Sequence, residues 1–188
     1  MSRQIKRYIC YKCLNDMYHI NFDGNVSSKH NINISSYIPK IIADLVNKIP
    51  DNYNNNYIVC PYYKKYYDYQ IGITETVKLE ESNNEAILRG VNEEVGLSNI
   101  TWGIHNSITY NNWYGVLTHN STYTYDPNTI HNTNDDTYNK VAIILHDNIY
   151  TLIRKFKFIK QGDIITDGIY GIGLISVYDC KKIINHNL

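Results

Sequence analysis

The stretch from Glu81 to Leu97 constrains this chain most, because it combines helical periodicity with signals for both helix ends. From Asn84 to Val95 the apolar residues recur at steps of three and four, which predicts an amphipathic helix with one buried stripe. Ser82 and Glu85 match a capping box at its start, and Gly96 is placed as a C′ glycine at its end. The predicted stripe consists of Ile87, Leu88, Val91 and Val95.

Three charged residues, Arg89, Glu93 and Glu94, lie off the predicted stripe. Arg89 and Glu93 are spaced as an i,i+4 ion pair. The simplest interpretation is a solvated acidic face of a surface helix. The alternative is a metal site, because carboxylates on one helical face can converge on a hard divalent cation.

The same stretch resembles the signature of the Nudix hydrolase superfamily. Seven of the nine fixed positions match in one register: Glu81, Arg89, Val91, Glu93, Glu94, Gly96 and Leu97. Two positions depart, since Glu75 stands where the signature has glycine, and Gly90 stands where it has the glutamate after the arginine. The resemblance implies an α/β fold, an α/β/α sandwich around a mixed β-sheet, with the signature forming a loop–helix–loop over residues 75–97.

In this family the glutamates of the signature bind Mg²⁺ or Mn²⁺, which activates water against a phosphoanhydride. By resemblance, Glu93 and Glu94 would be catalytic metal ligands, and Arg89 would orient them. Gly90 has no carboxylate to contribute, which predicts weak or no hydrolysis. Glu75 or Glu80 can replace the missing group only if the fold brings it near, and spacing does not decide this.

Composition limits the partners of the chain. Its 188 residues predict a single domain, and its formal net charge of zero provides no general attraction to nucleic acid or membrane. No apolar window is long enough to span a bilayer. The high count of asparagine and of tyrosine, beside three alanines, indicates an AT-rich genome such as that of a large DNA virus, a protist or a low-GC bacterium.

Cysteine usage predicts a cytoplasmic protein with reduced thiols, and the N-terminus lacks the apolar segment of a signal peptide. Cys10 and Cys13 form half of a zinc-binding pattern, but a second pair is missing, so buried free thiols are the favoured interpretation. The seven histidines are scattered without metal-ligand spacing, and we expect them at the surface.

Two aromatic groups are candidates for stacking on a base. The first lies in the tyrosine-rich stretch 57–69, where lysines could neutralise phosphates, and the second follows the predicted helix. For both groups the favoured interpretation is that of ordinary strand and core residues. The candidate ligand-binding residues are Lys64, Lys65, Tyr66, Tyr67, Trp102, Trp113 and Tyr114.

Elsewhere, periodicity and turn residues predict alternating strands and helices. Strands are expected at 5–14, 17–22, 71–77, 100–108, 113–117, 141–146 and 170–178. Helices are expected at 37–49, as an insertion before the signature, and at 180–185 after Asp179 as a cap. Residues 148–158 suit either a helix or a strand, and residues 25–36 and 119–139 are expected to be loops.

These observations favour a degenerate Nudix-fold protein that binds a nucleotide, an mRNA cap or RNA with weak or no hydrolysis. The alternative is an active Mg²⁺- or Mn²⁺-dependent hydrolase of nucleoside diphosphate-linked substrates such as caps. A third hypothesis is a structural or assembly protein that reuses the fold to bind a protein partner.

Overall fold

The computed structural model of the protein describes residues 7–9, 17–22, 25–29, 33–35, 37–63, 68–97, 103–119, 138–160 and 169–187. In this part of the chain, eleven strands form one mixed sheet. The strands are β1 (Arg7–Ile9), β2 (Met17–Ile20), β3 (Val26–Lys29), β4 (Asn33–Ser35), β5 (Tyr57–Tyr63), β6 (Asp68–Tyr69), β7 (Ile73–Thr76), β8 (Gly103–Tyr110), β9 (Trp113–His119), β10 (Lys140–Asp147) and β11 (Ile169–Ser176).

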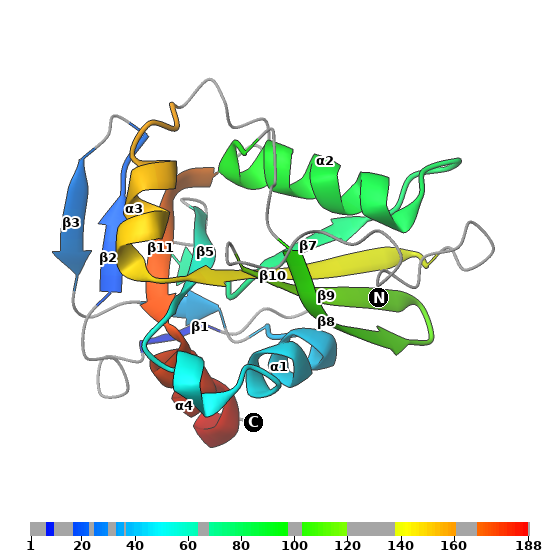
Figure 1. Ribbon diagram of the computed structural model, residues 1–188, viewed down its shortest axis with the longest axis horizontal. Coiled ribbons are helices and arrows are strands. Elements are labelled where there is room, and N and C mark those ends of the chain that lie inside the picture. Colours follow the sequence, from blue (N-terminus) through cyan, green and yellow to red (C-terminus); the bar gives the residue numbers. More distant parts are fainter. Residues whose placement is uncertain are drawn as a thin grey trace.

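Helices cover both faces of this sheet, so the predicted α/β class is confirmed. In Figure 1, α2 lies above the strands, and α1 and α4 lie below them. The helices are α1 (Lys40–Asn47), α2 (Asn83–Val95), α3 (Ile149–Phe156) and α4 (Val177–Asn187), with a 3₁₀ turn η1 (Asp51–Tyr53). No helix in the described ranges is long and apolar enough to cross a membrane.

Strand β10 connects the two parts of the sheet. Along its length it pairs in parallel with β9, which forms a hairpin with β8. Its first half also pairs with β7, and its last two residues, His146 and Asp147, pair with β5. β5 in turn pairs with β11, which continues through β2 to β3. β10 therefore has strand neighbours on both sides.

Alternation along β10 divides the hydrophobic core into two layers. Ala142 and Ile144 belong to the layer beneath α1 and α4. Val141, Ile143 and Leu145 belong to the layer beneath α2 and α3. Odd- and even-numbered residues of β10 thus face opposite sides of the sheet, because successive side chains of a strand alternate between its faces.

The predicted caps of α2 are present. Ser82 and Glu85 form the reciprocal capping box, and Gly96 ends the helix in the left-handed conformation with φ of 78°. The predicted stripe is wrong at two residues, however. Leu88 is 51% exposed, whereas Glu94 is only 5% exposed. The helix is rotated relative to the sequence prediction because its buried face also includes the small residues Ala86 and Gly90.

Three other segments correct or decide a sequence prediction. The expected loop at 25–36 contains β3 and β4, because their polar sequences pair through backbone groups with β2 and β1. The ambiguous segment 148–158 forms α3, whose cap is Asn148. At α4, Ser176 and not Asp179 is the capping side chain, since its Oγ accepts from the Asp179 amide. Most of 5–14 and of 119–139 lies outside the described residues.

The packing of α1 on β9 generates a stability prediction. A Cβ atom at Gly115 would lie 2.8 Å from Cδ1 of both Ile41 and Leu45, which are buried. We expect Gly115→Val to lower the free energy of unfolding by about 1–3 kcal/mol, as overpacked core substitutions do. Urea denaturation measures this, with Thr109→Val at an exposed position of β8 as the control. Equal midpoints for the two variants would contradict the packing described here.

Candidate active site

Arg89 is the centre of a charged cluster at the side of α2. Its Nε donates to Glu81 Oε2 at 2.8 Å, and its Nη2 donates to Glu81 Oε1 at 2.9 Å. Nη2 also donates to the carbonyl oxygen of Thr76 at 2.6 Å. This bidentate pairing lowers the pKa of the Glu81 carboxyl and raises the pKa of the Arg89 guanidinium. The pair fixes the loop before α2 to the helix.

The same guanidinium holds two further carboxylates. Its Nη1 lies 3.2 Å from Glu75 Oε1, on β7, and 3.3 Å from Glu93 Oε2, one helical turn along α2. The four side chains are only 13–25% exposed. Arg89 therefore gathers acids from three separate segments. We call Glu75, Glu81, Glu93 and Glu94, which surround Arg89, the carboxylate cluster.

Glu75 occupies the space that a side chain at position 90 would take. A Cβ atom added at Gly90 would lie 3.1 Å from Glu75 Cβ, 3.3 Å from its Cγ and 3.6 Å from its Oε2. β7 thus supplies a carboxylate next to the position where α2 lacks one. A signal for this was present in the sequence. Glutamate stands at position 75 where the signature has glycine, and glycine stands at position 90 where it has glutamate. Only the fold shows that the two positions touch.

Glu94 is the most buried acid of the cluster. Tyr63 on β5 donates its hydroxyl to Glu94 Oε1 at 2.7 Å. Glu94 Oε2 is buried and has no hydrogen-bond partner in the described part of the chain. Burial, together with the charges of Glu75 and Glu93, raises the pKa of Glu94 to about 8. A buried carboxyl oxygen without a partner is costly, and a bound cation would satisfy it.

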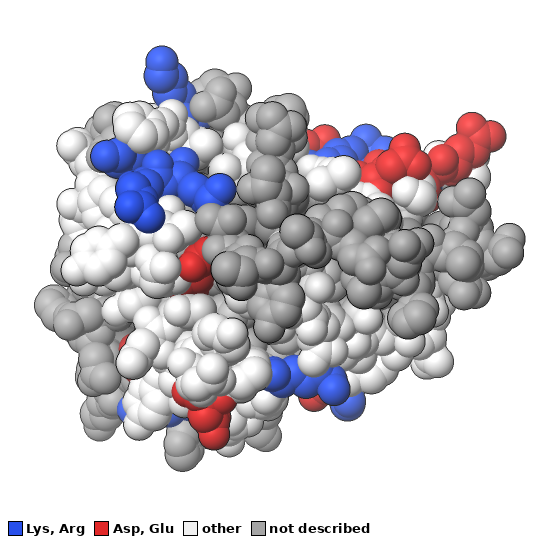
Figure 2. Space-filling view, viewed as in Figure 1, with Lys and Arg blue, Asp and Glu red and all other residues white. Residues whose placement is uncertain are grey.

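The cluster is strongly acidic even though the whole chain is neutral. Four carboxyls face a single guanidinium, so the local charge at neutral pH remains negative with Glu94 protonated. Figure 2 shows acidic side chains concentrated over the N-terminal end of α2, while basic side chains gather over α3. The local field therefore favours a cation at the carboxylate cluster.

The donor set suits a hard divalent cation, because Mg²⁺ and Mn²⁺ prefer carboxylate oxygens. No group of three or more His, Cys, Asp or Glu side chains in the described ranges is arranged to hold a metal ion. Within the cluster, Arg89 accounts for this arrangement, since its N–H groups hold oxygens of Glu75 and Glu93. A cation would bind at the remaining oxygens or displace these contacts.

The predicted aromatic residues are not all brought to this cluster. Trp113 lines an open depression of about 230 Å³ together with Thr74, Thr76, Lys140 and Glu75, the last of which belongs to the carboxylate cluster. The Lys140 ammonium lies 5.3 Å from the centroid of the Trp113 ring. Trp113 packs against the core layer of α1, on the face of the sheet opposite α2. Tyr114 is fully buried, so its ring is not exposed for stacking on a ligand.

The tyrosine-rich stretch is divided by its burial. Tyr69 is 3% exposed and belongs to the interior, and the half-buried Tyr62 packs against it with 4.6 Å between ring centroids. Tyr63, from the same stretch, donates a hydrogen bond to Glu94 of the carboxylate cluster. The remaining candidates, Lys64, Lys65, Tyr66, Tyr67 and Trp102, and the cysteines Cys10 and Cys13, lie outside the described residues.

The prediction that the histidines lie at the surface was wrong for His19, His119 and His146, which are buried, and His105 is half-buried. His105, His119 and His146 come from three strands and pack ring against ring, with centroids 4.7–5.2 Å apart. We call these three residues the histidine cluster. His119 and His146 are 3% and 0% exposed, not surface residues. The three histidines are too far apart in the sequence to match a local metal-binding motif. The structure brings them together because they lie on the adjacent strands β8, β9 and β10.

Comparison with known proteins finds no relative for this chain. No family model matches it, and neither the curated proteins nor the solved structures contain a significant match.

The burial of Glu94 makes stability depend on pH. Because its folded pKa of about 8 exceeds the ordinary value of 4.5, its contribution to stability is complete below pH 4.5 and is lost as the pH rises through about 8. One pKa unit corresponds to about 1.4 kcal/mol, so we expect a loss on the order of a few kcal/mol in metal-free protein. In chemical denaturation, the free energy of unfolding of Glu94→Gln should change less with pH over this range than that of the parent protein.

The control for this measurement is Glu80→Gln, which removes an exposed carboxyl from the loop before α2. That variant should keep the parent profile. An identical slope in Glu94→Gln and the parent protein would show that Glu94 does not titrate as described.

Proposed function

We propose that this chain is a Nudix-type, divalent-metal-dependent hydrolase of nucleoside diphosphate-linked substrates, with capped RNA among the candidates. The α/β architecture, with α2 and α1 on opposite faces of a mixed sheet, is compatible with the Nudix sandwich. The observation that carries the proposal is the contact between Glu75 and Gly90. It argues that the carboxylate missing from the signature has been relocated to the adjacent strand.

The residues of the cluster have separable roles in this proposal. Glu75, Glu93 and Glu94 would hold Mg²⁺ or Mn²⁺. The bidentate pair of Arg89 with Glu81 positions the start of α2, and the remaining Arg89 N–H groups orient Glu75 and Glu93. Tyr63 orients Glu94 by donating to its Oε1.

When bound, the metal would polarise phosphoryl oxygens and lower the pKa of the attacking water. In the overall reaction one P–O bond to the bridging oxygen breaks, and one P–O bond to the water oxygen forms. The proton of the attacking water is released to solvent.

The competing proposal is a protein that binds a nucleotide, a cap or RNA without hydrolysis. Gly90 motivates that function, because it removes a carboxylate from the helix itself. The relocation of a carboxylate to Glu75 favours hydrolysis instead, since a binder has no need for an acid at this position. The assembly-protein hypothesis has no specific support in the described residues.

A reciprocal exchange tests the proposed site. We expect Glu75→Gly to reduce metal-dependent turnover at least about tenfold, because the loss even of outer-shell partners of a metal site usually costs that much. Gly90→Glu alone should crowd Glu75 and also reduce turnover. The double variant Glu75→Gly/Gly90→Glu returns one carboxylate to this space and should recover activity relative to Glu75→Gly. The measurement is release of nucleoside mono- and diphosphates from a cap analogue and from dinucleoside polyphosphates with Mg²⁺ or Mn²⁺.

The matched control is Glu80→Gln, which changes an exposed glutamate close to the cluster and should keep full turnover. Equal rates for Glu75→Gly and the parent protein would contradict the assignment of Glu75. Saturable binding of a cap analogue in EDTA, with no turnover under any metal, would instead establish the non-hydrolytic function.

A further inference from the structure

The histidine cluster lies at the carboxyl ends of two adjacent parallel strands. His119 is the last residue of β9, and His146 is the penultimate residue of β10. His105 enters from β8 at a point where the β8–β9 register shifts between Ile104 and Asn106. In open α/β sheets, the carboxyl ends of parallel strands are a common place for ligand sites.

The η1 turn and the residue segment after it cover the cluster. The ring of Tyr53 lies 5.3 Å from that of His119 and 5.9 Å from that of His146, between centroids. Asn56 Nδ2 lies 3.2 Å from His146 Nδ1. His105 is the most exposed of the three histidines, so solvent reaches the cluster on the side of His105.

The two ring nitrogens that face each other share a single proton. His105 Nε2 and His146 Nε2 are 2.9 Å apart, so one nitrogen donates and the other accepts. Burial lowers the pKa of His146 to about 3 and that of His105 to about 4, and it also lowers the pKa of His119. Burial thus disfavours the charged form of these rings, and neutral imidazole is the form that binds metals.

We propose that the histidine cluster binds one first-row transition-metal cation, such as Zn²⁺, through ring nitrogens of His105, His119 and His146. Imidazole suits Zn²⁺, Co²⁺ and Ni²⁺ and is a poor ligand for Mg²⁺. This site is separate from the carboxylate cluster and does not depend on the proposed hydrolase function.

The rings are close enough for such a site, but their donor atoms do not converge on one point in this arrangement, so the rings must turn for an ion to bind. Three imidazoles on one tetrahedral Zn²⁺, at Zn–N distances of about 2.0–2.1 Å, place their ring centroids roughly 5 Å apart. The observed separations are 4.7 Å, 5.1 Å and 5.2 Å. The facing Nε2 atoms of His105 and His146 must separate by roughly half an ångström, to the spacing of nitrogens on a tetrahedral metal. As they stand, their mutual hydrogen bond occupies the position of the ion.

Metal binding requires one neighbouring amide to turn, and a buried carboxylate lies on the other side of the cluster. If His146 binds through Nε2, its Nδ1 carries the proton and needs an acceptor, which the Asn56 amide provides by turning Oδ1 toward it. The buried carboxylate of Asp147 is close enough to His119 to oppose the lowering of its pKa. It therefore supplies the nearest negative charge for a divalent cation.

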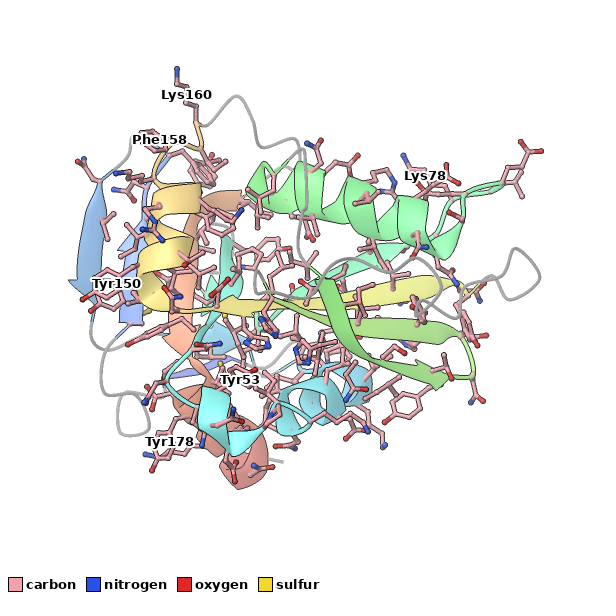
Figure 3. All side chains as sticks on the ribbon, in the orientation of Figure 1. Tyr53, Lys78, Tyr150, Phe158, Lys160 and Tyr178 are labelled. Atoms are coloured by element: carbon pink, nitrogen blue, oxygen red, sulfur yellow. The ribbon has the colours of Figure 1, made fainter. Side chains whose placement is uncertain are left out.

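The two clusters occupy different faces and ends of β10. His146 has the parity of Ala142 and Ile144, which belong to the layer of α1. Glu75 contacts Gly90 of α2 and is paired with Val141, near the start of β10. In Figure 3, Tyr53 lies in the lower half of the view by η1, and Lys78 lies in the upper half at the N-terminal end of α2. A ligand at one cluster does not contact the other.

The experiment is a calorimetric titration of chelator-treated protein with Zn²⁺, in a Cys10→Ser/Cys13→Ser background that removes the predicted half-site of thiols. We expect one Zn²⁺ per chain, no competition by Mg²⁺, and a visible absorption band when Co²⁺ is used as the probe. His105→Asn and His119→Asn should each weaken binding at least about tenfold, since a ligand contributes no less than an outer-shell partner.

Two control variants distinguish this site from other sources of binding. His19→Asn removes a buried histidine on β2 that bonds to Tyr69 outside the cluster, and should keep the parent affinity. Glu93→Gln removes a carboxylate of the other cluster and should also keep it, whether or not hydrolysis is observed. X-ray absorption of the Zn²⁺-loaded parent chain counts imidazole ligands directly if a histidine variant does not fold.

Three imidazole ligands in that spectrum, or loss of binding confined to the His105 and His119 variants, would support the site. Absence of Zn²⁺ binding by the folded chain would overturn it. Unchanged Zn²⁺ affinity in both His105→Asn and His119→Asn would also overturn the proposed site, as would loss of Zn²⁺ binding in Glu93→Gln.

Discussion

The burial of β10 on both faces is the constraint on which the rest of this structure depends. Its hydrogen bonds are shared among β9, β7 and β5, so both edges of the strand are paired. Its alternating side chains therefore define two core layers, one for each pair of helices. Each polar cluster is positioned by this strand. The carboxylate cluster lies near its start on the α2 side, and the histidine cluster lies at its end on the α1 side.

The two clusters represent opposite ways of keeping ionisable groups inside a protein. In the carboxylate cluster, one guanidinium neutralises part of a negative charge, and the most buried acid, Glu94, retains its proton to high pH. In the histidine cluster, burial lowers the pKa values of all three groups and so disfavours their charged forms. Both arrangements leave lone pairs directed at neighbouring groups that a cation could replace. Such buried titratable groups are typical of functional sites more than of ordinary cores.

Local features of α2 were predictable because they depend on residues within one or two helical turns. The Ser82–Glu85 capping box, the left-handed Gly96 and the pairing of Arg89 with Glu93 all follow from spacing. The rotation of the helix did not follow. Leu88 is exposed and Glu94 buried because the sheet beneath accepts the small residues Ala86 and Gly90, and that surface is contributed by distant strands.

By itself, the sequence determined the helix with its caps, most strands, and the set of acids from which a metal site could be built. Only the tertiary structure decided which acids meet, because Glu75 reaches the space at Gly90 through the pairing of β7 with β10 and the packing of α2 over both. It also decided that His105 and His146, 41 positions apart, share a proton. Such contacts depend on strand order and register, which side-chain periodicity along one segment does not encode.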